Sequence, residues 1–360
     1  MKVKVVAGII AISLVVGGCG SLAGRHNIDS GFSYIENYDY NSAMESFMAA
    51  EENGEDVCLI HRGKGIIYLN TGDYQGAVDE LLASLAADEG IVDDMDFDTN
   101  YYLAEAYSKL GEYNKAKEVY DAILALRSKD SNAYYLRGAA ELASGNHDSA
   151  YTDFTKAITL NPRDYSMIIL IYKALADYGY EDEALSILEA AMNNGSQFMS
   201  NYEKGQISYY LGNYSDATEF LRTASNERDQ EKEPVVLLLG KTWETLGEYP
   251  SAISEYKSYL KESPDSARIY NQLGICLLGQ GKNSAKQETK QELFEEAIRA
   301  FESGKAIDDK EVNQAIRLNM ITAYEYLGDF TTAQSLMSEY LRDYPDDSAA
   351  NRENVFLSTR

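Results

Sequence analysis

A spacing of small, large and turn residues that recurs about every 34 residues limits what this chain can fold into. In residues 131–164 the spacing places Gly138 in a first predicted helix, a break at Gly145, and Ala150 and Phe154 in a second predicted helix. Small residues let two antiparallel helices approach closely, and large residues fill the space between neighbouring pairs. One such hairpin cannot bury its own apolar face. The spacing therefore predicts a stacked array of helix pairs.

When the unit is numbered from Ser131, the spacing fits the chain nine times, with copies that start at Gly24, Cys58, Phe97, Ser131, Tyr165, Phe198, Glu233, Ala267 and Gln314. Position 20 is alanine in every copy: Ala43, Ala77, Ala116, Ala150, Ala184, Ala217, Ala252, Ala297 and Ala333. Position 24 is always large and apolar: Phe47, Leu81, Tyr120, Phe154, Leu188, Leu221, Tyr256, Phe301 and Met337. Position 8 is glycine or alanine except at Tyr172 and Ile321, so the fifth and ninth copies fit least well.

This pattern resembles the tetratricopeptide repeat, whose signature places a small residue, a turn and A-x3-F within a 34-residue period. The resemblance implies an all-α fold, a right-handed superhelical solenoid of about nine antiparallel helix-turn-helix repeats over residues 24–347. Turn signals such as Gly72-Asp73 and Gly247-Glu248 support it. Residues 348–360 are predicted to form a capping helix, with Val355, Phe356 and Leu357 covering the last hairpin.

Two segments interrupt the period. Residues 91–96 add a few acidic positions between the second and third copies, and residues 282–292 add eleven between Gly281 and Ala297. The composition of the longer segment favours helix, so the second helix of the eighth copy could begin early. A polar excursion from one face is the other possibility. We favour a tolerated surface loop.

The amino terminus has the pattern of a secretory signal. Lys2 and Lys4 precede an apolar run of 12 residues, which ends in small residues before Cys19. A span of the bilayer needs about 20 apolar residues. The segment resembles a bacterial lipoprotein signal, which implies that residues 1–18 are removed, that Cys19 is lipidated, and that residues 19–23 form a short tether. An ordinary signal peptide is the alternative. The expected location is extracytoplasmic, on the cell membrane, or on the outer membrane of a cell that has two.

The net charge of −26 argues against nucleic acid and against electrostatic adhesion to anionic lipid. Removing residues 1–18 also removes two lysines, which leaves 30 basic and 58 acidic residues, or −28. A membrane anchor must therefore be the lipid itself. Most of the 29 tyrosines are explained by the aromatic positions of the repeat.

Candidate chemistry is sparse. Asp94, Asp96, Asp98, Asn100 and Glu105 have the spacing of a calcium loop, but Thr99 stands where glycine is needed for the turn. Asp96 and Asp98 are better explained as helix-capping groups. His61 and His147 fall in aromatic positions of the repeat, and Cys58 and Cys276 lie too far apart in the array for a disulfide. We expect no metal, no cofactor and no enzyme.

The resemblance implies a scaffold that holds a protein or peptide partner in the groove lined by the first helices. The competing hypothesis is a non-catalytic subunit of an envelope system for cell-wall or polysaccharide assembly, which recognises glycan; a spacer without a ligand is a third. Positions 5 and 9 lack the lysine and asparagine of the carboxylate clamp of some relatives, which favours a long, uncharged or mildly basic partner. The predicted groove residues are Tyr101, Glu105, Tyr135, Lys173, Tyr202, Gln206, Tyr209 and Lys241, with Glu325 further along.

Overall fold

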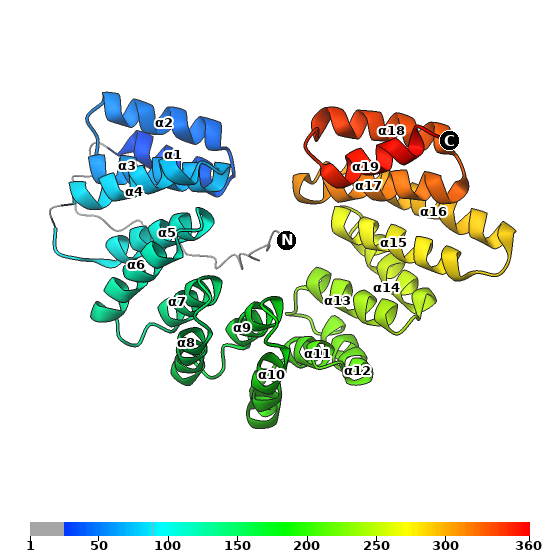
Figure 1. The fold of residues 1–360 in the computed structure, drawn as a ribbon, viewed down its shortest axis with the longest axis horizontal. Helices are drawn as coiled ribbons and strands as arrows, with labels where there is room; N and C mark the ends of the chain where they lie inside the picture. Colours follow the sequence, from blue (N-terminus) through cyan, green and yellow to red (C-terminus); the bar gives the residue numbers. More distant parts are fainter. Residues whose placement is uncertain (1–24, 89) are drawn as a thin grey trace. The chain divides into compact units, whose positions relative to one another are not determined.

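The computed structural model describes residues 25–88 and 90–360, and these residues form helices and no strands. They divide into two compact units, one that ends at Ala191 and one that comprises Met192–Arg360. The predicted all-α repeat architecture is confirmed in both units (Figure 1). The segment with the predicted lipoprotein signal and Cys19 lies outside the described residues.

The first unit is a series of antiparallel helix pairs, the last of which crosses the boundary: α1 (His26–Glu36), α2 (Tyr40–Glu52), α3 (Val57–Thr71), α4 (Tyr74–Ala87), α5 (Asp94–Lys109), α6 (Tyr113–Leu126), α7 (Ser131–Ala143), α8 (His147–Leu160), α9 (Tyr165–Asp177) and α10 (Glu181–Gly195).

The second unit begins with the short 3-10 helix η1 (Ser196–Phe198) and continues with four more pairs and a final single helix: α11 (Asn201–Tyr210), α12 (Tyr214–Ser225), α13 (Lys232–Thr245), α14 (Tyr249–Glu262), α15 (Ala267–Asn283), α16 (Gln287–Ala306), α17 (Lys310–Leu327), α18 (Phe330–Asp343) and α19 (Ser348–Leu357).

Positions 20 and 24 of the repeat form the core of every hairpin. All nine alanines at position 20 have no exposed surface, and the nine large residues at position 24 are at most 2% exposed. Burying such side chains contributes about 1.5–3 kcal/mol each for the large ones. The core is therefore a chain of similar small clusters, each shared by neighbouring hairpins.

Glycine at position 8 makes room for the large residue at position 24. A Cβ atom on Gly138 would lie 2.8 Å from the ring of Phe154, and one on Gly205 would lie 2.6 Å from Leu221. Atoms this close would clash, so the two helices approach as they do because position 8 has no side chain.

The fifth hairpin departs from this arrangement at Tyr172. Its helices, α9 and α10, are the most widely separated of the nine pairs in the described chain. Tyr172 occupies position 8, where its half-buried ring packs against the core cluster around Ile171 and Leu175. A tyrosine in this position holds the helices apart, and only Ala184 and Leu188 of α10 are buried.

The eighth hairpin absorbs the eleven extra residues as helix, so the surface-loop interpretation is wrong. Only Ser284 to Lys286 separate α15 from α16. A Cβ atom on Gly274 would lie 2.4 Å from Phe301, and one on Gly281 would lie 2.4 Å from Phe294. The second contact lies seven residues closer to the connection on each helix, which is about two helical turns. The hairpin is thus lengthened in register.

Two further predictions, about residues near the ends of helices, are corrected by the structure. Asp93 caps α5, and the Asp96 side chain accepts a hydrogen bond from the Asp93 amide at 2.9 Å, as expected of a capping box. Asp98 has no capping role; its carboxylate lies 3.6 Å from Arg62. In the final helix α19, Leu357 is 1% exposed, but Val355 is 66% exposed and does not cover the last hairpin.

Candidate interaction surface

Several neighbouring first helices contact one another within each unit and form a shared surface there. In the first unit α3 lies beside α1 and α5, and in the second unit α13 lies beside α11 and α15. Positions 5, 9 and 12 of the repeat are the ones that the tetratricopeptide resemblance places on this surface. They are therefore the positions from which a bound partner could be contacted.

In the first unit, Tyr101, Glu105 and Lys173 are half-buried on α5 and α9. The Tyr101 ring centroid lies 6.2 Å from that of Tyr120, and burial raises the pKa of Tyr101. Burial also raises the pKa of Glu105, which Lys109 one turn later partly offsets. These three side chains keep part of their surface open to solvent.

Tyr135 lies in the core rather than on an open surface. It is 7% exposed, and its ring centroid lies 6.2 Å from that of Phe154. Burial raises the pKa of Tyr135 to about 12. The correction has a simple cause: position 5 faces the neighbouring hairpin in this repeat, and α7 turns its ring inward over the position 24 residue.

In the second unit, Tyr202, Gln206 and Tyr209 are half-buried along α11, and Lys241 is exposed on α13. The Lys241 ammonium lies 5.8 Å from the centroid of the Tyr209 ring. Tyr209 also meets the edges of Tyr210 and Tyr214, with centroids 5.4 Å and 5.6 Å away. The structure thus brings Tyr209 and Lys241 together from adjacent repeats as a fixed aromatic and cationic pair.

Arg62 is a buried residue of this surface that the sequence analysis did not single out. It occupies position 5 of the second copy, is 1% exposed, and lies between the rings of Phe32 and Tyr102 at 5.6 Å and 5.7 Å. Burial lowers its pKa. A charged residue at a position that is uncharged in every other copy was the signal that could have identified it.

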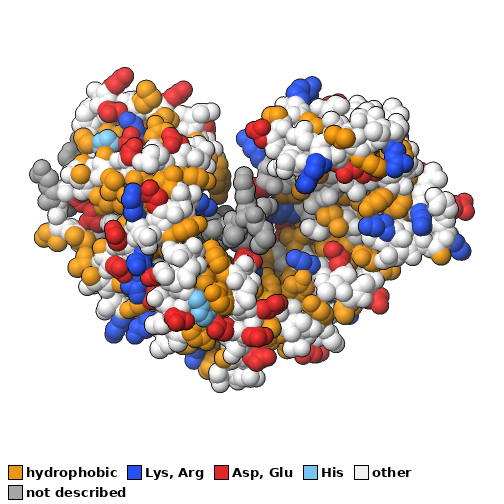
Figure 2. Space-filling model, viewed as in Figure 1, with side chains coloured by type: hydrophobic (Ala, Val, Ile, Leu, Met, Phe, Trp, Pro, Cys, Tyr) orange, Lys and Arg blue, Asp and Glu red, His pale blue; other side chains and the backbone are white. Residues whose placement is uncertain are grey.

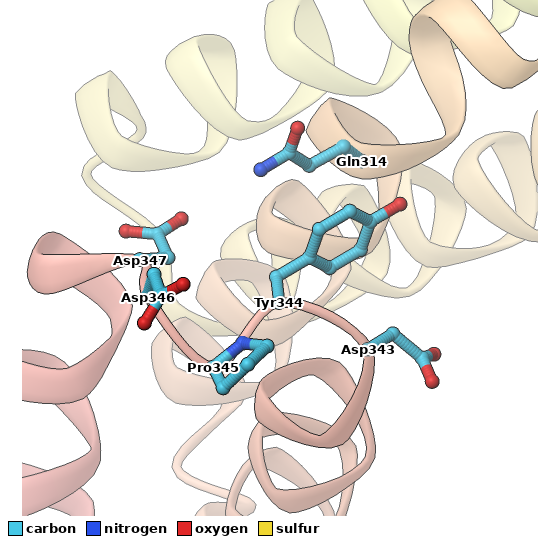
Figure 3. A pocket seen from close by; sticks show the side chains of 6 residues that line it. All are labelled: Gln314, Asp343, Tyr344, Pro345, Asp346 and Asp347. Carbon is cyan, nitrogen blue, oxygen red and sulfur yellow. The ribbon is translucent and has the colours of Figure 1, made fainter.

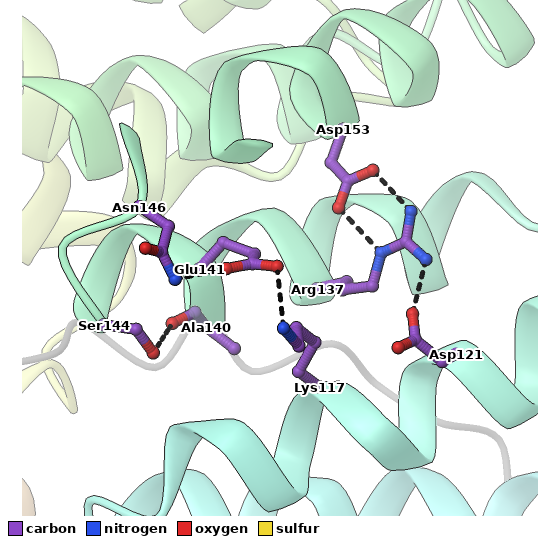
Figure 4. A network of polar contacts seen from close by, with 8 residues as sticks. All are labelled: Lys117, Asp121, Arg137, Ala140, Glu141, Ser144, Asn146 and Asp153. Carbon is purple, nitrogen blue, oxygen red and sulfur yellow. Dashed lines mark hydrogen bonds and ion pairs between the residues drawn. The ribbon is translucent and has the colours of Figure 1, made fainter. Parts of the chain in front are cut away.

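A polar network joins the third and fourth repeats (Figure 4). Arg137 donates to both carboxylate oxygens of Asp153, at 2.8 Å and 2.7 Å, and to Asp121 at 2.6 Å. The hydrogen bonds to Asp153 raise the pKa of Arg137 most, and the bond to Asp121 raises it further. Nearby, Glu141 accepts from Asn146 at 2.8 Å and pairs with Lys117 at 3.4 Å. These bonds fix α6, α7 and α8 against one another.

An open hollow near the carboxyl terminus contains three carboxylates and the ring of Tyr344 (Figure 3). Asp347 caps α19 and accepts a bond from the Tyr340 hydroxyl at 2.7 Å, and Asp343 pairs with Arg317 at 2.8 Å. Two of the three carboxylates therefore stabilise local structure.

The remaining polar candidates are also engaged in the fold. His61 bonds to Glu80 and His147 bonds to Glu183, each at 2.6 Å. Cys276 is buried, and burial raises its pKa. Across residues 25–88 and 90–360, no three His, Cys, Asp or Glu side chains are grouped so that they could hold a metal ion.

Comparison with known families agrees with the repeat pattern. Two family models match the chain, both described as tetratricopeptide repeats, at residues 101–165 and 315–347. The chain contains tetratricopeptide repeats. The matched ranges cover most of the third and fourth copies and most of the ninth, so tetratricopeptide repeats are present at places far apart in the sequence.

Proteins of other organisms resemble longer stretches of the chain. A TPR repeat-containing protein of Methanocaldococcus jannaschii is 25% identical over 250 residues, which is 65% of this chain and 42% of that protein. A BBSome complex member of Bos taurus is 25% identical over 183 residues, 50% of this chain and 34% of the relative. This chain thus spans less than half the length of either. A solved tetratricopeptide repeat protein from Parabacteroides merdae is 19% identical, with a TM-score of 0.43, over 82% of this chain and 97% of its own.

No helix in the described part of the chain has both the length and the apolar composition that a membrane crossing requires.

Proposed function

We propose that this tetratricopeptide protein is a lipid-anchored, extracytoplasmic scaffold that holds a protein or peptide partner on the surface of its first helices. The lipid would be attached at Cys19, after removal of residues 1–18. Two or three acyl chains, at about 0.8 kcal/mol per buried methylene, would hold a chain of this charge at a membrane.

The observation that carries the binding proposal is the paired Tyr209 and Lys241 on adjacent first helices of the second unit. Tyr202 and Gln206 lie on the same helix as Tyr209 and keep part of their surface open. Aromatic faces and amide groups suit an extended, uncharged or mildly basic peptide, which gains contact area at low cost in side-chain entropy. Lys241 would then donate a hydrogen bond to a backbone carbonyl or a hydroxyl oxygen of the partner.

A photo-crosslinking amino acid at Gln206 tests this surface in the full chain. We expect capture of a protein or peptide from the cell envelope, reduced at least fivefold by Tyr202→Ala or Lys241→Ala. Lys261→Ala is the matched control, because Lys261 is exposed on α14, a second helix. Equal capture by all variants would place binding elsewhere. Capture of glycan instead would support the envelope-assembly hypothesis, since tyrosine faces also stack on sugars.

Radiolabelled fatty acid tests the anchor independently. Label is expected in the wild-type chain and absent from Cys19→Ala, which should also leave the membrane fraction. A labelled, membrane-bound Cys19→Ala variant would overturn the lipoprotein proposal and leave the peptide-binding proposal standing.

A further inference from the structure

The α4–α5 loop, described at residues 88 and 90–93, combines acidic and apolar side chains, and residues 90–93 are exposed. Residues 88–96 contain five acidic residues and no basic one. Ile91 is 93% exposed and Val92 is 55% exposed, the first being the most exposed large apolar side chain of the described chain. Burial, together with the carboxylates of Asp88 and Asp93, raises the pKa of Asp96. Apart from Asp94, which pairs with Arg127, these carboxylates lie near two uncovered aliphatic residues without a basic partner in the segment. Figure 2 shows acidic and hydrophobic side chains next to one another on the face of the molecule that it draws.

The outer end of the α15–α16 hairpin has the opposite character. The inserted segment, residues 282–292, contains three lysines, Lys282, Lys286 and Lys290, and two acidic residues, Glu288 and Glu292. Lys282 and Lys286 are exposed, and none of the ion pairs formed between described residues involves any of the three. This basic end stands out in a chain whose net charge is −26.

Close packing fixes the basic end in place. Gly281 lies against Phe294, and Gly279 lies against Tyr249, where a Cβ atom would be 2.5 Å from the ring. Phe294 stacks on Tyr326 at 5.5 Å, and the Lys282 ammonium lies 5.2 Å from the Tyr326 centroid. Tyr326 remains 41% exposed. The end of the hairpin thus presents lysines beside an uncovered aromatic ring on rigid helices.

Lys286 and Lys290 are not placed there to stabilise α16, whereas Lys282 lies in the last turn of α15, where a positive charge is favourable. Lys286 is the N-cap residue of α16 and makes no side-chain capping bond, and Lys290 follows in the first turn. Positive charge at a helix amino terminus opposes the helix dipole, and acidic or hydroxyl side chains are preferred there. The position of these charges is better explained by an external partner.

We propose that two copies of this chain associate head to tail, with the acidic α4–α5 loop of one copy against the basic α15–α16 end of the other. The two segments that interrupt the repeat are complementary in charge; the acidic one carries uncovered apolar side chains, and the basic one lies beside the uncovered ring of Tyr326 on α17. Ile91 and Val92 would cover Tyr326 of the second copy, and Lys282, Lys286 and Lys290 would face Asp88 and its acidic neighbours. Burial of the apolar side chains provides affinity, and the charges provide register.

Other anionic partners fit less well. Recruitment to an anionic bilayer is typical of clusters of about 4–8 basic residues, and here there are three beside a strongly acidic chain. A nucleic acid would meet the same repulsion. Two copies of this chain also repel one another at long range, but the Debye length of about 8 Å at physiological salt screens that repulsion and leaves contacts at ion-pair distance. Association should therefore weaken at low salt.

Cysteine crosslinking between two co-expressed, differently tagged full-length copies tests the contact. One copy carries Val92→Cys and the other carries Lys286→Cys, so a disulfide between the two tags can form only between copies. We expect a mixed disulfide on mild oxidation. The matched control replaces Val92→Cys with Leu126→Cys, an exposed apolar position on α6, and copies without added cysteines report background from Cys58 and Cys276.

Charge reversal and truncation give the second measurement. Lys290→Glu in the basic copy should lower the mixed disulfide at least fivefold, and Asp88→Lys in the other copy should restore part of it, whereas Lys261→Glu should change nothing. Ile91→Ser should lower it without changing the melting temperature, because Ile91 is 93% exposed. No mixed product, an equal yield from Leu126→Cys, or insensitivity to Lys290→Glu would each overturn the proposal. So would crosslinking of Lys286→Cys to a different acidic protein in place of the second copy.

Discussion

Gly240 on α13 leaves the space that the ring of Tyr256 on α14 fills: a Cβ atom there would lie 2.1 Å from Cζ of the ring. Glycine to alanine inside a helix normally stabilises by about 0.5–1 kcal/mol. Gly240→Ala should instead destabilise by about 1–3 kcal/mol, because the ring is fully buried and must move. Urea unfolding measures the change, and Ser254→Ala, exposed on α14, is the control that should be neutral. Stabilisation by Gly240→Ala would contradict the close approach.

Alanine at position 20 is expected to be intolerant of any larger side chain. Ala150 and Ala217 have no exposed surface, so Ala150→Leu or Ala217→Leu should overpack its hairpin and cost about 1–3 kcal/mol. Ala122→Leu adds the same atoms at an exposed position of α6 and should be close to neutral. Unchanged unfolding midpoints for both core variants would count against the repeat register.

The Arg137 network should be sensitive to the loss of its cation. Asp153 is 5% exposed, so Arg137→Met would leave a carboxylate buried without its bidentate partner. Breaking a fully buried pair costs about 3–5 kcal/mol. We expect about 2–3 kcal/mol here, because the Arg137 side chain is 23% exposed.

The double variant Arg137→Met with Asp153→Leu should recover most of that loss, since it removes the unpaired charge as well. Denaturant unfolding of the two single variants and the double variant measures the coupling. Additive losses would mean that the two side chains do not act as a pair.

The contribution of His147 should depend on pH. Its Nε2 lies 2.6 Å from Glu183 of α10 and its Nδ1 lies 3.2 Å from Asp148, and the bond to Glu183, partly offset by burial, is the main cause that raises the pKa of His147. A raised histidine pKa stabilises the fold below the unfolded value of about 6.5, and this stabilisation is lost as the pH rises through the folded pKa.

The unfolding midpoints of wild type and His147→Gln should therefore differ more at pH 5.5 than at pH 8.5. Stacking of His147 on Tyr180, with centroids 3.9 Å apart, contributes at both values and leaves a residual difference at high pH. If the unfolding midpoints of the two proteins differ by the same amount at both pH values, the carboxylates do not stabilise the protonated ring.

Tyr38 is strained in a place where most other hairpins have glycine. Position 15 has a positive φ at Gly72, Gly145 and their equivalents, and Tyr38 adopts φ 58° there with its ring 80% exposed. The left-handed conformation costs an L-residue about 1–2 kcal/mol, and glycine avoids this cost. Part of the gain is lost because glycine makes the unfolded chain more flexible. Tyr38→Gly should thus stabilise by about 0.5–1 kcal/mol in thermal unfolding, and Gly72→Ala should do the reverse.

The sequence predicted the parts of the fold that every hairpin shares. Ala150 and Phe154 are buried because the helical period alone decides which side chains face the partner helix. The same reasoning failed for Tyr135, since whether position 5 is open depends on the neighbouring hairpin, which no local pattern describes. Asp98 was misassigned for a related reason: its partner Arg62 lies in the preceding repeat.

The lengthened eighth hairpin was predicted only in part. Its composition indicated helix, but the turn was placed at Gly281, the usual position 15. The second glycine and phenylalanine pair, Gly281 with Phe294, decides that the hairpin is lengthened as helix. This pair can be recognised only when the two helices are already aligned. For the wide fifth hairpin the sequence identified the unusual residue but not its effect. Tyr172 was recognised as an exception at position 8, and nothing in the sequence indicated that its helices would lie further apart.

The second glycine and phenylalanine pair also bears on how such a chain can evolve. Because the helix-to-helix contact recurs after two turns, both helices of a hairpin can gain two turns at the end that carries the connection, while the residues of the first contact keep their spacing. Lengthening of this kind adds surface to one hairpin without changing the core that the repeats share. A solenoid can in this way acquire a new surface on one repeat at a time, under selection separate from the selection that maintains its core.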